Sequence, residues 1–352
     1  MLDDIALLRQ MVEISSPSHH EEALATFLVE QMQQLGFAAR RDEAGNAIAQ
    51  VGEHGPLVVL LGHIDTVAGV VPVRQEAGRL YGRGTVDAKG PFASFIVATH
   101  RAYQAGSLNC RVVLIGAVEE EAATSKGAHF VVDQYAPDYC VIGEPSGWER
   151  VTLGYKGRLL ATYRHEQAGA HSAGEQKAAP EHMVDFWMAV QLRCAQYNAE
   201  RDRLFEQINP SLRAVASGSD GLNDWCEATL GLRLPEAIAP EQMAEELAQM
   251  ALQVTGETTI SFTGHCPAFR SPRSTPLASA FVRAIRGAGG NPGFVHKTGT
   301  ADMNVVGPAW KCPIVAYGPG DSRLDHAPDE HIVLDEYQRG IAVLTTVLAN
   351  LS

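Results

Sequence analysis

The sequence contains no apolar run near the roughly 20 residues that a membrane-spanning helix needs. It also has no excess of basic residues, because 28 lysines and arginines stand against 41 acids, a formal net charge of −13. This balance argues against a broad nucleic-acid-binding face. The first residues, MLDDIALLRQM, are acidic where a signal peptide is basic. We therefore expect a cytoplasmic protein with neither a membrane nor a nucleic acid as partner.

Several signatures of other enzyme classes are missing as well. The six cysteines include no C-x-x-C pair, which argues against a zinc ribbon and against a disulfide framework. There is no G-x-S-x-G nucleophile elbow and no recognisable cysteine nucleophile, so serine- and cysteine-based hydrolysis are disfavoured. The phosphate-binding pattern G-x-x-x-x-G-K-S/T is also absent, which argues against a phosphate cradle.

What the sequence does contain is an alternation of short apolar runs with helical patterns. At 352 residues the chain is long enough for roughly two domains. Continuous apolar strands that alternate with helices indicate an α/β layer built on a largely parallel, buried sheet. The runs that we expect to form this sheet are residues 57–61, 111–118, 139–143 and 312–318.

The middle of the chain has a different order of strand and helix patterns. Strand and helix patterns follow one another there in the order β-α-β-β-α-β, which is the ferredoxin-like order. We therefore expect residues 156–265 to form a separate α+β module. The flanking residues, 1–155 and 266–352, would together form the α/β domain into which this module is inserted.

Polar side chains gather where the apolar runs end. The first run leads into His63 and Asp65, and the second into the triple glutamate Glu119–Glu121. The third run ends at Glu144, and the fourth leads through GPGDSRLD to His326. In open α/β sheets, sites form outside the carboxyl ends of the strands. These side chains are therefore expected to meet at one edge of the sheet.

Asp87, in GRGTVDAKGP, adds another acid to this set. Each of these residues alone has an ordinary explanation, such as a hydrogen-bonded histidine or a solvated acidic turn. Together, however, so many carboxylates beside two histidines would repel one another strongly, and a cation resolves that repulsion. Imidazoles and carboxylates without a thiolate suit Zn²⁺ in a catalytic site, and Co²⁺ or Mn²⁺ could substitute for it.

Five motifs in register carry a resemblance to a known family. GHIDTV, GRGTVDAKGP, EEE, GEPSGW and LDHAPDE resemble, in order and spacing, the dinuclear-zinc aminoacylase and carboxypeptidase family. That family includes acetylornithine deacetylase and succinyl-diaminopimelate desuccinylase. The resemblance covers essentially the whole chain and implies a phosphorylase/hydrolase-like α/β zinc-peptidase domain with an inserted ferredoxin-like α+β domain. It also implies that this insertion is a lid and a dimerisation domain.

Within the family, the chain is most similar to the lysine-biosynthetic branch. VDAKGPFASFI, HKTGTADMNVVGPAW and VAYGPGDSRLDHAPDEHI carry this closer likeness. The resemblance implies release of lysine or ornithine from LysW, an acidic γ-glutamyl carrier protein that protects the amino group. The alternatives are deacylation of a small molecule, such as acetylornithine, acetyl-lysine or succinyl-diaminopimelate, and a catalytically inactive metal-binding relative.

The resemblance also assigns roles at the centre. It implies two zinc ions per subunit, held by His63 and Glu144 on one ion, by Glu121 and His326 on the other, and by Asp87 between them. Asp65 would orient His63, and Glu120 would be the general base. Because relatives have DEE where this chain has EEE, we align Glu119 with their aspartate. The resemblance further implies a non-proline cis peptide bond after Asp87.

In the inserted module, the resemblance assigns a lid histidine and a substrate-binding arginine. His171 would reach the partner subunit's site and polarise the scissile carbonyl, which requires a homodimer. Arg233 would hold a carboxylate of the substrate. Relatives carry an asparagine shortly before the strand of this arginine, and here either Asp220 or Asn223 could take its place.

Overall fold

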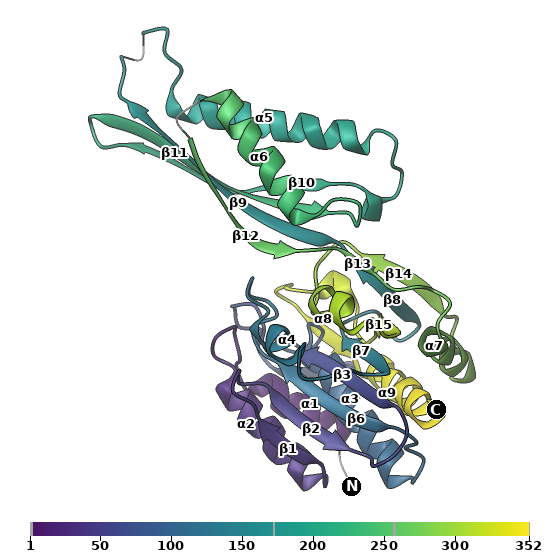
Figure 1. Cartoon of the computed structure of the whole chain (residues 1–352). Helices are drawn as coiled ribbons and strands as arrows, with labels where there is room; N and C mark the ends of the chain where they lie inside the picture. Colours follow the sequence, from purple (N-terminus) through teal and green to yellow (C-terminus); the bar gives the residue numbers. More distant parts are fainter. Residues whose placement is uncertain (1–2, 172, 256–257, 352) are drawn as a thin grey trace. The chain divides into compact units, whose positions relative to one another are not determined.

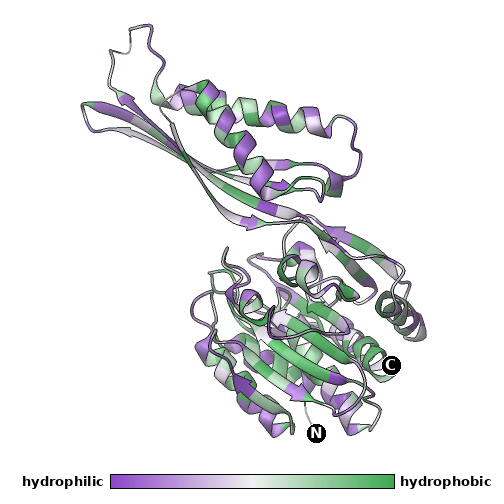
Figure 2. Ribbon diagram, in the orientation of Figure 1, coloured by the Kyte–Doolittle hydropathy of each residue, from purple (hydrophilic) through white to green (hydrophobic). Residues whose placement is uncertain are grey.

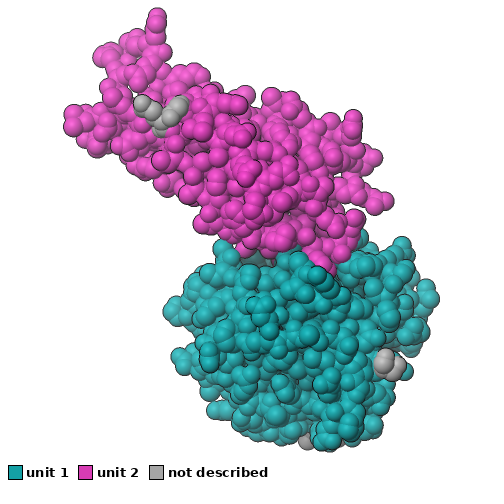
Figure 3. Space-filling model, in the orientation of Figure 1, with its two compact units in different colours: residues 1–154, 271–296, 301–352 teal, residues 155–270, 297–300 magenta. Residues whose placement is uncertain are grey.

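The computed structural model describes residues 3–171, 173–255 and 258–351 (Figure 1). The chain divides into two compact units, which Figure 3 distinguishes by colour. The first unit consists of residues 1–154, 271–296 and 301–352, and the second of residues 155–270 and 297–300. Each unit has a hydrophobic core of its own. Within the described ranges, no helix is both long enough and apolar enough to cross a membrane.

The first unit is an α/β layer around a mixed sheet, as the apolar runs predicted. Its inner strands pair in parallel, β6 with β3, β3 with β7, and β7 with β15. These strands are mostly hydrophobic in Figure 2, as expected for a sheet that is buried on both faces. In spatial order the strands of this unit are β1 (Ala38–Arg41), β2 (Ala47–Val51), β6 (Arg111–Ala117), β3 (Leu57–His63), β7 (Tyr139–Gly143), β15 (Ile314–Ala316) and β8 (Arg150–Tyr155), which also pairs with β14 (Gly293–Lys297).

Helices and a small second sheet complete the first unit. The helix α3 (Lys89–Gln104) is buried along most of its length and packs against β3 and against α9 (Leu334–Asn350). A small antiparallel sheet is formed by β4 (Arg74–Glu76), β5 (Arg79–Tyr81) and β16 (His331–Val333). The remaining helices are α1 (Asp4–Glu13), α2 (Glu22–Gln34), α4 (Lys126–Val131), α7 (Pro276–Gly287) and α8 (Met303–Trp310).

The second unit has the ferredoxin-like order that the sequence predicted. Two helices lie on a four-stranded antiparallel sheet with the strand order β10-β11-β9-β12. The elements follow one another as β9 (Gly157–Ala168), α5 (Ala179–Asn198), β10 (Asn209–Ser219), β11 (Asn223–Leu234), α6 (Pro240–Val254) and β12 (Thr258–Cys266). A two-residue strand, β13 (Phe269–Arg270), follows β12 and belongs to the nine-stranded sheet rather than to this one.

Candidate metal centre

Parallel pairing places the ends of the central strands at one edge of the sheet. His63 is the last residue of β3, the triple glutamate begins two residues after β6, and Glu144 follows β7 directly. Asp87 precedes α3, and the peptide bond between Asp87 and Ala88 is cis, as the sequence motif predicted. His326 arrives on the loop between β15 and β16.

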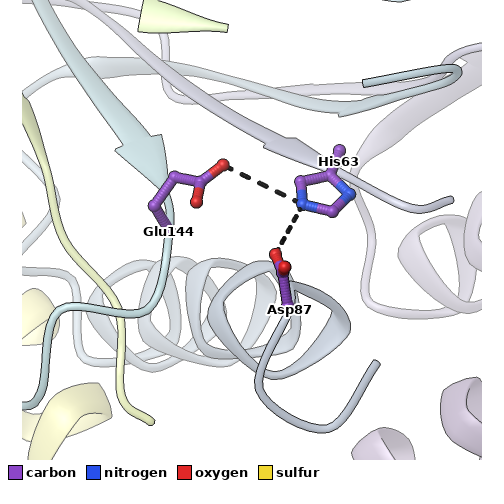
Figure 4. Close-up of side chains that lie close together, drawn as sticks. All are labelled: His63, Asp87 and Glu144. Atoms are coloured by element: carbon purple, nitrogen blue, oxygen red, sulfur yellow. Dashed lines mark hydrogen bonds and ion pairs between the residues drawn. The ribbon is translucent and has the colours of Figure 1, made fainter. Parts of the chain in front are cut away.

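The structure brings the five predicted ligands together in two groups that share Asp87. His63, Asp87 and Glu144 form one group, and Asp87, Glu121 and His326 form the other. In each group one ligand atom per residue lies within 4.8 Å of the others. Figure 4 shows the first group, in which Asp87 and Glu144 both point toward the imidazole of His63.

The carboxylate of Asp87 lies between the two imidazoles. Its Oδ1 is 3.1 Å from Nε2 of His63, and its Oδ2 is 3.1 Å from Nε2 of His326. On the outer sides, Oε1 of Glu121 is 2.9 Å from Nε2 of His326 and Oε1 of Glu144 is 3.9 Å from Nε2 of His63. A carboxylate that offers one oxygen to each group has the geometry of a bridging ligand.

Asp65 lies behind His63 and supports the glutamate loop. Nδ1 of His63 is 3.0 Å from the carbonyl oxygen of Asp65 and 3.4 Å from its Oδ1, so this nitrogen carries the hydrogen and Nε2 faces the site. The carboxylate of Asp65 also accepts hydrogen bonds from the backbone N–H groups of Glu120 and Glu121, each at 3.0 Å. Asp65 therefore positions both an imidazole and the loop that carries two acids.

The charges of the cluster shift the pKa values of its members. Burial alone would lower the pKa of His63, but hydrogen bonds with Asp65 and Asp87 raise it well above its ordinary value. Hydrogen bonds with Asp87 and Glu121 raise the pKa of His326 to about 10. Burial raises the pKa of Glu120 and of Glu121. The crowded carboxylates therefore favour an added positive charge, which a cation would supply.

The donor set fits a pair of divalent ions. Each group offers three ligands made of imidazole nitrogen and carboxylate oxygen, which leaves positions open as in catalytic sites. The set contains no thiolate, so it suits Zn²⁺, Co²⁺ or Mn²⁺. Glu120, whose Oε2 is 4.0 Å from Nε2 of His63, stands beside the two groups and belongs to neither.

Two buried acids at this edge escaped the sequence analysis. Asp302, at the start of α8, is buried, and in the described part of the chain neither of its carboxylate oxygens has a hydrogen-bond partner. Its burial raises its pKa to about 7. Glu330, in the motif that supplies His326, is also fully buried. The sequence could have pointed to these acids only through their places in two motifs, LDHAPDE for Glu330 and HKTGTADMNVVGPAW for Asp302.

The segment before α2 supports the glutamate loop. Ser18 and Glu21 have the spacing of a capping box, but α2 begins at Glu22 and has no side-chain cap. The hydroxyl of Ser18 donates instead to Oδ2 of Asp65, at 2.7 Å. The carboxylate of Glu21 accepts from the backbone N–H of Glu119, at 3.1 Å. The two residues with the capping-box spacing therefore do not cap α2. Ser18 hydrogen-bonds to Asp65 instead, and Glu21 to the loop of Glu119–Glu121.

The residues predicted in the inserted module all lie in the second unit. His171 is exposed, and its Nδ1 accepts from the backbone N–H of Ala173. Arg233, in β11, is partly buried and donates to the hydroxyl of Thr300 at 3.1 Å. Asp220 and Asn223 lie at the turn between β10 and β11, where the carboxylate of Asp220 accepts from the backbone N–H of Asn223 at 2.7 Å.

Comparison with known families identifies the class of this chain. A model described as peptidase family M20/M25/M40 matches residues 59–350. The chain belongs to this family. The chain is thus an amide-bond hydrolase, and the reaction class expected from its motifs is confirmed.

Two relatives indicate which branch of the family the chain resembles. The chain is 47% identical over 350 residues to the LysW-lysine hydrolase of Deinococcus radiodurans, covering 98% of this chain and 96% of the relative. It is 27% identical over 335 residues to the LysW-lysine/LysW-ornithine hydrolase of Saccharolobus solfataricus, covering 95% of this chain and 92% of the relative. These names agree with the branch that the sequence motifs indicated.

Solved structures agree on the fold. An M20 family metallo-carboxypeptidase from Sulfolobus solfataricus superposes with a TM-score of 0.84 at 16% identity, covering 99% of both chains. A tripeptidase from Staphylococcus aureus superposes with a TM-score of 0.82 at 15% identity, covering 100% of this chain and 99% of the other. At such low identity the likeness concerns the fold alone. It includes the ferredoxin-like second unit, because the match spans the whole chain.

Proposed function

We propose that this protein is a two-metal amidohydrolase that releases lysine, ornithine or both from LysW, the carrier named in its relatives. The observation that carries the proposal is the pair of ligand groups that share Asp87, in a chain 47% identical to a LysW-lysine hydrolase over its whole length. The donor set favours zinc, with Co²⁺ or Mn²⁺ as substitutes. His63 and Glu144 would hold one ion, Glu121 and His326 the other, and Asp87 both.

The side chains around this centre supply the remaining chemistry. Two divalent ions held by these ligands would acidify a water molecule and polarise the scissile carbonyl. Glu120 takes a proton from that water and returns it to the leaving amine, a role that its burial beside His63 supports. Asp65 keeps the imidazole of His63 in the tautomer whose Nε2 faces the centre.

We further propose that residues 156–265 act as a lid and dimerisation domain, with Arg233 binding a carboxylate of the substrate and His171 polarising the scissile carbonyl in the partner subunit's site. On α5, Val184, Met188 and Leu192 recur every fourth residue and are 46%, 61% and 60% exposed. In the described residues β10 pairs with β11 alone, and its residues are exposed along most of its length. An apolar helix stripe beside an open strand edge is a surface that a second copy would cover.

Turnover on a panel of substrates tests the proposed function. We expect hydrolysis of LysW-linked lysine or ornithine to exceed that of acetylornithine, acetyl-lysine and succinyl-diaminopimelate by at least tenfold in kcat/KM, because carrier contacts add transition-state binding. The metal-loaded protein is assayed on all five at equal metal occupancy. Preference for one of the small molecules would make the protein a small-molecule deacylase, and inactivity on all five would make it a catalytically inactive relative.

A further inference from the structure

Glu330 is a buried acid that the reaction described above does not use. It lies four residues after His326, in the motif DHAPDE, and its side chain is 0% exposed. Buried carboxylates are rare unless hydrogen bonds or ion pairs satisfy them. Its partners therefore indicate what it does.

Those partners belong to the loop that leads to Asp87. Oε1 of Glu330 accepts hydrogen bonds from the backbone N–H of Val86 at 2.9 Å and of Asp87 at 3.2 Å. Oε2 accepts from Nη1 of Arg83 at 2.8 Å. The side chain of Glu330 thus fixes the backbone of Val86 and Asp87, and Arg83 balances the negative charge of Glu330.

The backbone around Glu330 is aligned with the same loop. The carbonyl oxygen of Glu330 accepts from the backbone N–H of Gly82 at 3.1 Å. The next residue, His331, pairs with Tyr81 where β16 meets β5. The segment that starts at His326 therefore runs alongside residues 79–87, and the carboxylate of Glu330 extends this alignment from the strand pair to Asp87.

This alignment fixes the distance between Asp87 and His326, on which the metal centre depends. Oδ2 of Asp87 is 3.1 Å from Nε2 of His326, and both residues reach this position on loops. Loops hold ligand geometry less precisely than helices or strands unless neighbouring hydrogen bonds fix them. The carboxylate of Glu330 joins the two loops at the backbone of Val86 and Asp87 on one side and four residues from His326 on the other.

We propose that Glu330 is a positioning residue that keeps the bridging carboxylate of Asp87 in register with His326. This inference rests on the proposed function, because it concerns the same metal centre. Glu330 does not touch the reacting atoms and acts through the backbone of Val86 and Asp87. The competing explanation is that Glu330 only neutralises the buried guanidinium of Arg83, which would affect folding but not the centre.

Cobalt binding to the metal-free protein, followed by calorimetry and by the visible spectrum of Co²⁺, separates these explanations. In Glu330→Gln, one of the two oxygens becomes an N–H₂ donor; because the guanidinium of Arg83 attracts the remaining oxygen, the N–H₂ would face the backbone N–H groups of Val86 and Asp87, which would lose their acceptor. We expect a folded protein whose weaker Co²⁺ site loses about 10–100-fold in affinity, with an altered spectrum, as is typical for groups that orient metal ligands. We also expect kcat to fall by at least tenfold while KM stays within about threefold.

A matched control and a second variant complete the test. Asp138→Asn changes another carboxylate that accepts from a backbone N–H, that of Leu57 at the opposite end of β3 from His63, and we expect it to leave Co²⁺ binding unchanged. Glu330→Asp keeps the charge beside Arg83 but withdraws the acceptor by one methylene, and it decides the question if Glu330→Gln does not fold. Wild-type Co²⁺ affinity and kcat in a folded Glu330 variant would overturn the inference. A wild-type protein that binds no Co²⁺ would overturn the metal centre itself.

Discussion

Three consecutive glutamates lie in three different environments. Glu119 has a left-handed backbone with φ 59°, and its carboxylate accepts from the hydroxyl of Thr124 at 2.8 Å. Glu120 lies beside His63, and Glu121 contacts His326. Strand alternation could not have assigned these roles, because the left-handed residue breaks the alternation that a strand would impose. The assignment drawn from the motif instead depends on the spacing of relatives, and it calls for a direct test.

Glu120→Gln supplies that test. The amide cannot accept the proton of the attacking water, so we expect kcat to fall by about 10²–10⁴-fold. Metal content should stay at the wild-type level, because Glu120 belongs to neither ligand group. Elemental analysis and initial rates on the best substrate measure the two quantities.

Glu119→Gln is the matched control in the same loop. Its carboxylate lies among Thr124, His19 and Lys126, so we expect kcat within about threefold of wild type. If Glu119→Gln loses activity and Glu120→Gln keeps it, the alignment of the triple glutamate is shifted by one residue.

A second prediction about individual residues concerns the protons released when metal binds. Without metal, hydrogen bonds with Asp87 and Glu121 raise the pKa of His326 to about 10, so this imidazole is protonated at pH 7.5. Metal ligation requires neutral imidazole, so binding at this pH should release at least one proton, that of His326. The affinity should therefore rise as pH increases from 6.5 toward 10. Calorimetry in buffers of different ionisation enthalpy counts the protons, and an affinity independent of pH would contradict the assignment of His326 as a ligand.

At the scale of elements, strands were easier to predict than the details at their ends. The buried strands β3, β6 and β7 are almost entirely apolar, and this pattern located them within a few residues. The β-α-β-β-α-β order of the second unit was also predicted from the sequence, although β10 is exposed along most of its length. The residues that support the metal centre could not be predicted in this way, because Ser18 and Glu330 act through contacts between segments far apart in the chain. Local patterns carry no information on such contacts.

Gly90, in α3, shows how an element can be constrained by its neighbours. Helix propensity alone favours alanine over glycine by about 1 kcal/mol. An added Cβ at Gly90 would, however, lie 2.2 Å from the carbonyl oxygen of Thr85, just before the Asp87 loop. We therefore expect Gly90→Ala to lower the free energy of unfolding by about 1–3 kcal/mol, as for overpacked sites. Denaturant unfolding followed by circular dichroism measures this change.

Gly287, the last residue of α7, provides the matched control. Nothing lies within 4 Å of a Cβ added there. Gly287→Ala should accordingly leave the unfolding free energy unchanged or raise it by a few tenths of a kcal/mol. Equal stability of the two variants would show that the loop before α3 adjusts at little cost in free energy. It would then argue against a rigid backbone at Asp87.

At the scale of the whole molecule, the groups to which we assign roles in the reaction are distributed over two units. The ligands and Glu120 belong to the first unit, whereas Arg233 and His171 belong to the second. A chain organised in this way can close over its substrate with its own second unit or share groups with a partner copy. The exposed stripe on α5 and the open edge of β10 favour a partner copy.

Mixing two inactive variants distinguishes these arrangements. We expect Glu120→Gln and His171→Ala each to be impaired alone, because each removes one group from the reaction. If His171 acts in the partner subunit's site, a mixed dimer contains one site with both groups intact, so an equal mixture regains up to about a quarter of wild-type activity. Differently tagged subunits verify the exchange, and Met188→Asp in both chains should prevent it by charging the apolar stripe. Verified exchange without recovered activity would place His171 in its own subunit's reaction or outside the reaction altogether.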